Sequence, residues 1–169
     1  MARALQNQGL TVDFVTPHLR LPIYTAERLW FNQWLVRRDL PPCDMTVGFD
    51  MDGYRLAGLE GVPHVASIKG VIADEARFER GPTRWSMLLQ AACERAHVRR
   101  ADLVMTTSRY AARRLEELYG VRKVSIIPEA IDLAGWCELF ARNPAQPDPR
   151  RFVVLSVCRF YPRKRLPLL

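Results

Sequence analysis

Residues 101–127, ADLVMTTSRYAARRLEELYGVRKVSII, contain a strand pattern, a helix pattern and a second strand pattern in succession. The apolar run Leu103–Thr106 predicts the first strand, and Val121–Ile127 predicts the second. Between them, Ser108 is expected to cap a helix that stops at Gly120. A strand, a helix and a strand in this order are typical of a parallel sheet covered by helices.

The residues before this unit repeat the alternation of strands and helices. Thr25 is expected to cap a helix that runs to about Arg38, and a longer helix follows Pro82. Further strands are expected at Thr11–Thr16, Met45–Phe49 and Pro63–Ile68. The sequence therefore predicts an α/β fold with a Rossmann-like parallel sheet and helices on both faces.

Apolar side chains at helical spacing are expected to pack the two long helices on the core. In the first helix these are Leu29, Trp30, Trp34 and Leu35, and in the second they are Trp85, Met87, Leu88, Ala91 and Ala92.

A proline-rich stretch divides the chain. Residues 135–150 contain three prolines and are expected to be an inter-domain linker. Residues 1–134 would form the first domain, and residues 151–169 would begin a second Rossmann-like domain with a strand over Phe152–Val157. We expect a first strand to be missing at one end and most of the second domain at the other. We therefore expect a fragment that lacks both ends of its native fold.

The net charge of +7 is concentrated near the C-terminal end. Six cations and no acid follow Pro149, so the first 149 residues carry a net charge of only +1. This distribution argues against a broad nucleic-acid surface, and no nucleic-acid partner is expected. No apolar run approaches the roughly 18 residues that span a bilayer, and no signal-peptide pattern opens the chain. A cytoplasmic location is expected.

Neither the cysteines nor the histidines have a metal-binding spacing. The four cysteines form no C-x-x-C pair and are expected to be scattered reduced thiols. The three histidines, His18, His64 and His97, are also far apart in the sequence. No metal ion and no cofactor are therefore expected.

Polar side chains follow four predicted strands, at the position where open α/β sheets bind ligands. Asp50, Lys69 and Ser108 follow three strands of the first domain. Arg159 and Lys164 follow the strand of the second domain, on either side of a turn. A guanidinium and an ammonium group placed in this way can bind one diphosphate.

Each of these side chains also has a structural interpretation. Asp50 could serve the turn before Gly53, Ser108 could be only a helix cap, and Lys69 could face solvent. The basic residues 159–165 could be a solvated loop. The order of these side chains along the chain favours a binding site.

Three segments resemble a large family of retaining GT-B glycosyltransferases, the family 4-like proteins also called glycosyl transferases group 1. ADLVMTTSRYAARRLEELYGVRKVSIIPEAIDLAGW (101–136) is similar to the end of that family's N-terminal domain. FVVLSVCRFYPRKR (152–165) resembles the start of its C-terminal domain, and MARALQNQGLTVDFVTP (1–17) resembles its first helix and second strand. The resemblance covers nearly the whole chain.

The resemblance implies two domains that close over a cleft, with the acceptor bound mainly by the first and a nucleotide sugar by the second. Arg159 and Lys164 would bind the donor diphosphate, without an obligatory metal. Lys69 stands where the family usually carries a histidine and is the catalytic candidate, while Asp50 and Ser108 are acceptor-side candidates.

The sequence also departs from the family's pattern at several positions. Pro128-Glu129-Ala130 replaces Pro-Asn-Gly. Cys158 and Arg165 each replace a glycine.

The predicted function is transfer of a sugar from a UDP- or GDP-sugar, with retention, to a sugar, lipid-linked or small-molecule acceptor. The fragment itself is expected to be inactive. The resemblance allows a peripheral position at the inner membrane face, with docking by Trp30, Phe31 and Trp34. Two alternatives stay open. One is a nucleotide-sugar epimerase of the same architecture, and the other is a non-catalytic domain whose basic tail binds anionic membrane or nucleic acid.

Overall fold

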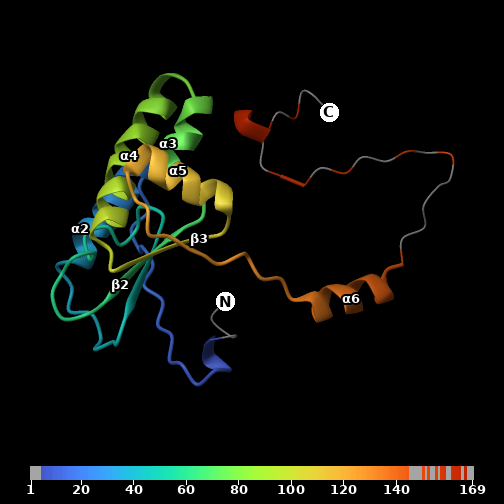
Figure 1. Ribbon diagram of the computed structural model, residues 1–169, viewed down its shortest axis with the longest axis horizontal. Coiled ribbons are helices and arrows are strands. Elements are labelled where there is room, and N and C mark those ends of the chain that lie inside the picture. The colour runs from blue at the N-terminus through green and yellow to red at the C-terminus, as the bar shows by residue number, and fades with distance from the viewer. Residues whose placement is uncertain are drawn as a thin grey trace.

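The computed structural model describes residues 5–144, 150, 152, 155, 157, 158, 161–164 and 166. Its centre is a four-stranded sheet in the order β1-β2-β3-β4, and every neighbouring pair of strands is parallel. The strands are β1 (Thr46–Phe49), β2 (His64–Ile68), β3 (Leu103–Thr106) and β4 (Ser125–Ile126). Helices flank the sheet (Figure 1), so the predicted α/β fold with a Rossmann-like parallel sheet is confirmed.

The helices are α2 (Tyr24–Leu35), α3 (Ile72–Glu75), α4 (Gly81–Arg100), α5 (Arg109–Tyr119) and α6 (Leu133–Arg142), with short 3-10 turns η1 (Ala76–Phe78) and η2 (Pro162–Lys164). The main core lies between the sheet and the helices α4 and α5. Its buried side chains include Ala66 and Ile68 of β2, Val98 of α4 and Leu115 of α5. All five residues of β2 are buried, as expected for a strand in the interior of a parallel sheet.

The β3–α5 unit forms as its sequence predicts. Leu103–Thr106 is β3, and Ser108 Oγ accepts a hydrogen bond of 3.1 Å from the amide of Ala111. Gly120 ends α5 with a φ of 73°, a left-handed conformation that glycine adopts without strain. These features are determined by neighbouring residues, which explains why the sequence predicts them.

The strand predicted over Val121–Ile127 is shorter than expected. Only Ser125 and Ile126 pair with β3. The amide of Val121 instead donates to the carbonyl of Leu115, so this residue belongs to the C-terminal cap of α5. A strand continues only where its backbone finds a neighbour, and the residues before Ser125 do not pair with β3.

Three other predictions are wrong. Thr11–Thr16 is not a strand, because no neighbour pairs with it and Phe14 is 70% exposed. Thr25 is not the cap of α2. Ile23 holds that position, while Thr25 lies buried inside the first turn. Trp85 is 74% exposed on α4 and does not fill the core.

The range predicted to be a linker contains most of α6. Asp132 caps this helix by accepting a 3.0 Å hydrogen bond from the amide of Gly135. In Figure 1, α6 lies apart from the sheet and its helices, and none of its residues is buried. The division into domains at residues 134 and 150 stays a prediction.

The strand predicted over Phe152–Val157 falls partly outside the described residues. Of that range, the structure describes Phe152, Leu155 and Val157, which lie outside any strand and are more than 80% exposed. A strand needs a neighbour to pair with, and these exposed residues have not joined the sheet.

Candidate functional site

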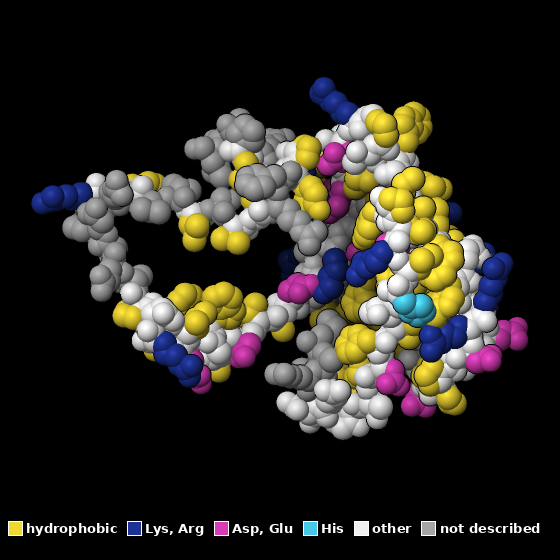
Figure 2. All heavy atoms as spheres, turned by 180° about the vertical axis from the view of Figure 1, so that it is seen from behind, with side chains coloured by type: hydrophobic (Ala, Val, Ile, Leu, Met, Phe, Trp, Pro, Cys, Tyr) yellow, Lys and Arg dark blue, Asp and Glu magenta, His cyan; other side chains and the backbone are white. Residues whose placement is uncertain are grey.

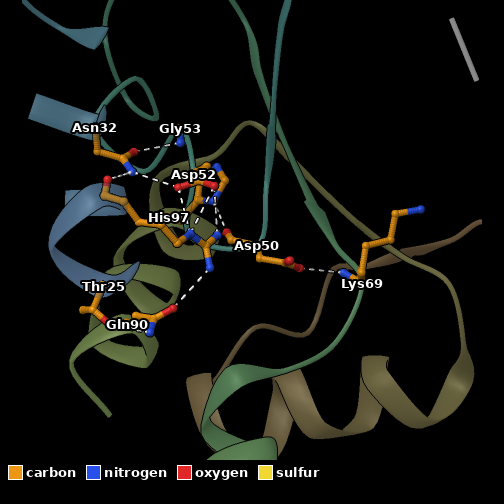
Figure 3. Close-up of polar contacts among 9 residues, drawn as sticks. Thr25, Asn32, Asp50, Asp52, Gly53, Lys69, Gln90 and His97 are labelled. Atoms are coloured by element: carbon orange, nitrogen blue, oxygen red, sulfur yellow. Dashed lines mark hydrogen bonds and ion pairs between the residues drawn. The ribbon is translucent and has the colours of Figure 1, made fainter. Parts of the chain in front are cut away.

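The loop after β1 carries Asp50, which connects the ends of two strands. Its amide donates to the carbonyl of Ser67 (3.0 Å), and its Oδ1 accepts a 2.9 Å hydrogen bond from the amide of Lys69 (Figure 3). Burial raises the pKa of the Asp50 carboxyl, and the hydrogen bond from Lys69 opposes that rise. Asp50 therefore fixes the backbone from which the Lys69 side chain starts.

Helix α2 holds the same loop with polar side chains. The Arg28 guanidinium binds both carboxylate oxygens of Asp52, with an Nη2–Oδ2 distance of 3.0 Å. Asn32 donates from Nδ2 to Asp52 Oδ1 (3.1 Å) and accepts at Oδ1 from the amide of Gly53 (2.8 Å). Because Arg28 and Asn32 are four residues apart, they share one face of the helix. That face is directed at the loop (Figure 3).

Gln90 of helix α4 hydrogen-bonds to two side chains of α2. Its Nε2 donates to Thr25 Oγ1 (2.7 Å), and its Oε1 accepts from Arg28 Nη1 (3.2 Å). Thr25 and Gln90 are both buried. The loop after β1 is therefore held by two layers of hydrogen bonds, in addition to the apolar packing of Met51.

Two buried histidines lie on the other side of the loop. The ring nitrogen Nδ1 of His97 lies 2.6 Å from the carbonyl of Asp50, and the Nε2 atoms of His97 and His64 are 2.7 Å apart. His64 Nδ1 lies 2.7 Å from Thr46 Oγ1. Burial lowers the pKa of both rings, that of His64 to about 4, so both are neutral at pH 7.

Glu94 of α4 holds the loop after β2. Its Oε2 accepts from the amide of Ile72 (2.8 Å) and from the hydroxyl of Tyr119 (2.6 Å). The residue is 0% exposed, and burial raises its pKa to about 8. Glu94 is thus a neutral acid at pH 7. The loop between Lys69 and Ile72 is held at both ends, by Asp50 and by Glu94.

The Lys69 side chain points away from these polar groups (Figure 3) and forms an ion pair with Glu129. Glu129 follows β4 by three residues, so this ion pair connects the loops after β2 and β4. The two side chains are 36% and 60% exposed and remain accessible from solvent. Both positions depart from the pattern of the resembled family. The two residues that differ from the family's pattern, Lys69 and Glu129, are therefore in contact.

The predicted site residues of the C-terminal segment have different outcomes. Arg159 lies outside the described residues. Lys164 belongs to η2, whereas its neighbour Arg163 forms an ion pair with Glu75 of α3. A Cβ atom on Gly70 would lie 2.6 Å from Glu75 Oε1, so Glu75 lies directly over the loop after β2. η2 therefore contacts α3 next to the loop after β2.

The candidate site is the sheet edge formed by the carboxyl ends of the parallel strands, which we call the carboxyl edge. Asp50, Lys69 and Glu129 follow β1, β2 and β4 there, and Ser108 caps the helix that follows β3. The structure brings Asp50 and Lys69 together, while the described contact of the Ser108 side chain is its cap bond.

Residues 45–134 match the family described as Glycosyltransferase Family 4, over more than half of the chain. The chain belongs to this glycosyltransferase family. The matched region contains all four strands and the whole carboxyl edge, including Lys69 and Glu129. Neither a curated protein nor a solved structure gives a significant match. The family membership identifies a glycosyltransferase-type domain, with a sugar donor and an acceptor as its general partners.

Two further features concern the described part of the chain. There, no three or more His, Cys, Asp or Glu side chains are grouped so that they could hold a metal ion. No helix among the described residues is long and apolar enough to cross a lipid bilayer.

Sequence reasoning missed most of the side chains that hold the two loops. On α4 the expected packing residues included Leu88 and Ala92, which are exposed. The buried polar residues of that helix are instead Gln90, Glu94 and His97. Their spacing of four and three residues was the available signal, because it places three polar side chains on one helix face.

Proposed function

We propose that the chain contains the acceptor-side domain of a nucleotide-sugar-dependent, retaining glycosyltransferase, with sugar transfer at the carboxyl edge. This proposal rests on the solvent-accessible ion pair between Lys69 and Glu129. The backbone of Lys69 is held in place by a hydrogen bond to Asp50. Surface ion pairs contribute little to stability. A rigid support for such a pair is more useful for binding than for folding.

The proposed reaction exchanges one bond at the anomeric carbon of the sugar. The bond from this carbon to the donor diphosphate breaks, and a bond to the acceptor oxygen forms on the same face. The acceptor proton passes to the leaving diphosphate. Arg159 and Lys164 would bind the diphosphate of a UDP- or GDP-sugar and stabilise its developing charge, with no obligatory metal.

Lys69 would act through its charge. An ammonium group only donates hydrogen bonds, so it can bind an acceptor oxygen but cannot take up its proton. In this proposal an oxygen of the acceptor replaces the Glu129 carboxylate as the partner of the Lys69 ammonium. Asp50 and Ser108 would support the acceptor side, and the acceptor is a sugar, a lipid-linked sugar or a small molecule.

The test is transfer by the full-length protein, with purified UDP- and GDP-sugars and mixed sugar acceptors. Lys69→Met should lower kcat about 100-fold, comparable to the loss of one preorganised donor. UDP and GDP affinity should stay unchanged in this variant and should fall in Lys164→Ala. Lys123→Met, an exposed lysine before β4, is the matched control. Full activity of Lys69→Met would overturn the role given to this residue.

We further propose that the domain contacts an anionic membrane surface through the first turns of α4. Trp85 is 74% exposed there, Phe78 and Leu89 are 40% and 50% exposed, and Arg80 and Arg84 are exposed beside them. Hydrophobic side chains lie next to a projecting basic side chain at the top of Figure 2. Tryptophan favours the membrane interface, and cations favour anionic headgroups.

This surface differs from the one expected from the sequence, because Phe31 is only 5% exposed. Co-sedimentation with vesicles of phosphatidylcholine and phosphatidylglycerol tests the proposal. Trp85→Ala should weaken binding several-fold, while Phe14→Ala, which removes a side chain of similar exposure, should not. Equal binding by both variants would contradict the proposal. So would binding that does not depend on the phosphatidylglycerol content of the vesicles.

A further inference from the structure

The buried histidines form a chain of hydrogen bonds whose direction is fixed. The carbonyl of Asp50 can only accept, so His97 Nδ1 carries a hydrogen. A neutral His97 then has a lone pair on Nε2, which accepts from Nε2–H of His64. His64 Nδ1 in turn accepts from the hydroxyl of Thr46. The two rings must therefore be opposite tautomers.

This chain ends on the most constrained residue of the loop. Among the described residues, Asp50 is the one non-glycine residue with a positive φ, at 52°. Such a conformation is strained and persists only where the surroundings enforce it. Here His97 holds the carbonyl of Asp50 and Ser67 holds its amide. The carboxylate is then directed at the amide of Lys69.

Two glycines allow the loop to pack closely on itself and on the histidine pair. A Cβ atom on Gly48 of β1 would lie 2.3 Å from the carbonyl oxygen of Asp52 and 2.8 Å from His97 Cε1. One on Gly53 would lie 3.0 Å from Gly48 Cα and 3.1 Å from His64 Cε1. A side chain at Gly48 would therefore require a shift of the loop backbone as well as of the His97 ring.

We propose that His97 and His64 are positioning residues that form a neutral pair of opposite tautomers. The pair holds Asp50 and, through Asp50, the backbone of Lys69. The effect on sugar transfer rests on the function proposed above, whereas the tautomers and the link to Lys69 do not.

Burial keeps the pair neutral, although Asp52 raises the pKa of His97 and Asp102 raises that of His64. Asp52 faces His97 from the loop, but Arg28 of α2 already binds its carboxylate. Asp102, before β3, accepts from the backbone amide of His64 (2.8 Å), and Glu94 lies three residues before His97 on α4. Protonation of His97 at Nε2 would place two N–H groups 2.7 Å apart, so acid should open the chain at His64–His97.

Nuclear magnetic resonance of the ¹⁵N-labelled full chain tests the pair without any activity. At pH 7, His97 should show a protonated Nδ1 and His64 a protonated Nε2. As the pH falls toward 4, the amide signals of Asp50 and Lys69 should shift together with the His97 ring. The variant His18→Gln, which removes an exposed histidine, is the control and should leave the response of the Lys69 amide unchanged. Identical tautomers in the two rings would overturn the proposal. So would a Lys69 amide signal that does not shift when the His97 ring signals shift.

The consequence for transfer is tested by two variants. The side-chain amide introduced by His97→Asn can still donate to the carbonyl of Asp50, whereas the side chain introduced by His97→Leu cannot. We expect His97→Leu to lower kcat about tenfold with an unchanged KM for the donor, and His97→Asn to recover most of the loss. Equal rates in both variants would overturn the positioning role. If the wild type transfers no sugar, the proposed function fails, and the resonance experiment still decides the histidine pair.

Discussion

Helices α4 and α5 pack against the same core but bury side chains of different kinds. α5 buries Ala111, Leu115 and Tyr119. α4 buries Ala91 and Val98 together with the polar residues Gln90, Glu94 and His97. A buried polar group costs free energy unless it is hydrogen-bonded. On α4, Glu94 and His97 hydrogen-bond to loops at the carboxyl edge and Gln90 hydrogen-bonds to helix α2, so α5 acts mainly as a scaffold and α4 positions the site.

The largest effect should come from a change in the apolar side chains that α5 buries. Leu115 is 0% exposed, so Leu115→Ala should lower the free energy of unfolding by about 2–5 kcal/mol. Because the Leu115 side chain makes none of the hydrogen bonds that hold the carboxyl-edge loops, the transfer rate of the folded fraction should not change. Chemical denaturation and a rate measured well below the midpoint check both parts. A slower folded enzyme would show that α5 also positions the site.

A smaller effect should come from the buried acid of α4. The folded-state pKa of Glu94 is raised to about 8, so its contribution to stability is complete below the unfolded pKa and is lost as the pH rises through 8. The wild type should therefore lose stability between about pH 5 and pH 9, by a few kcal/mol at most. Glu94→Gln should flatten this dependence, since a glutamine is never ionised.

Denaturation curves at several pH values measure this difference. Glu60→Gln, at an exposed carboxylate, is the control and should keep the wild-type pH profile. Parallel profiles for the wild type and Glu94→Gln would show that Glu94 is ionised in the folded protein.

The smallest effect concerns Ser108, which has a structural and a functional interpretation. Ser108→Ala removes the cap bond to Ala111 and should cost about 1 kcal/mol of stability. If Ser108 only caps α5, KM for the acceptor should stay unchanged. An increase in this KM would assign Ser108 to the acceptor side and extend the site to the N-terminus of α5.

The sequence predicts those parts of the molecule that depend on neighbouring residues. β3, the cap at Ser108 and the stop at Gly120 follow from local patterns, and the structure confirms them. Thr11–Thr16 has a strand pattern, but a strand also needs a neighbour, which a local pattern does not specify.

The candidate site was only partly predictable for the same reason. Asp50 and Lys69 were found because they follow strands. Glu129 was not, because 60 residues separate it from Lys69 and only the order of the strands brings the two together. The polar faces of α2 and α4 were missed because helix periodicity was read from apolar residues alone.

The central claim is that buried polar contacts position Lys69, and substitutions of Asp50 test it most directly. Asp50→Asn keeps an oxygen that can accept from the amide of Lys69, and asparagine tolerates a positive φ. Asp50→Gly relieves the backbone strain but removes the acceptor. We predict that the glycine variant is at least as stable as the asparagine variant but transfers sugar about tenfold more slowly. Equal transfer rates in the two variants would contradict the claim.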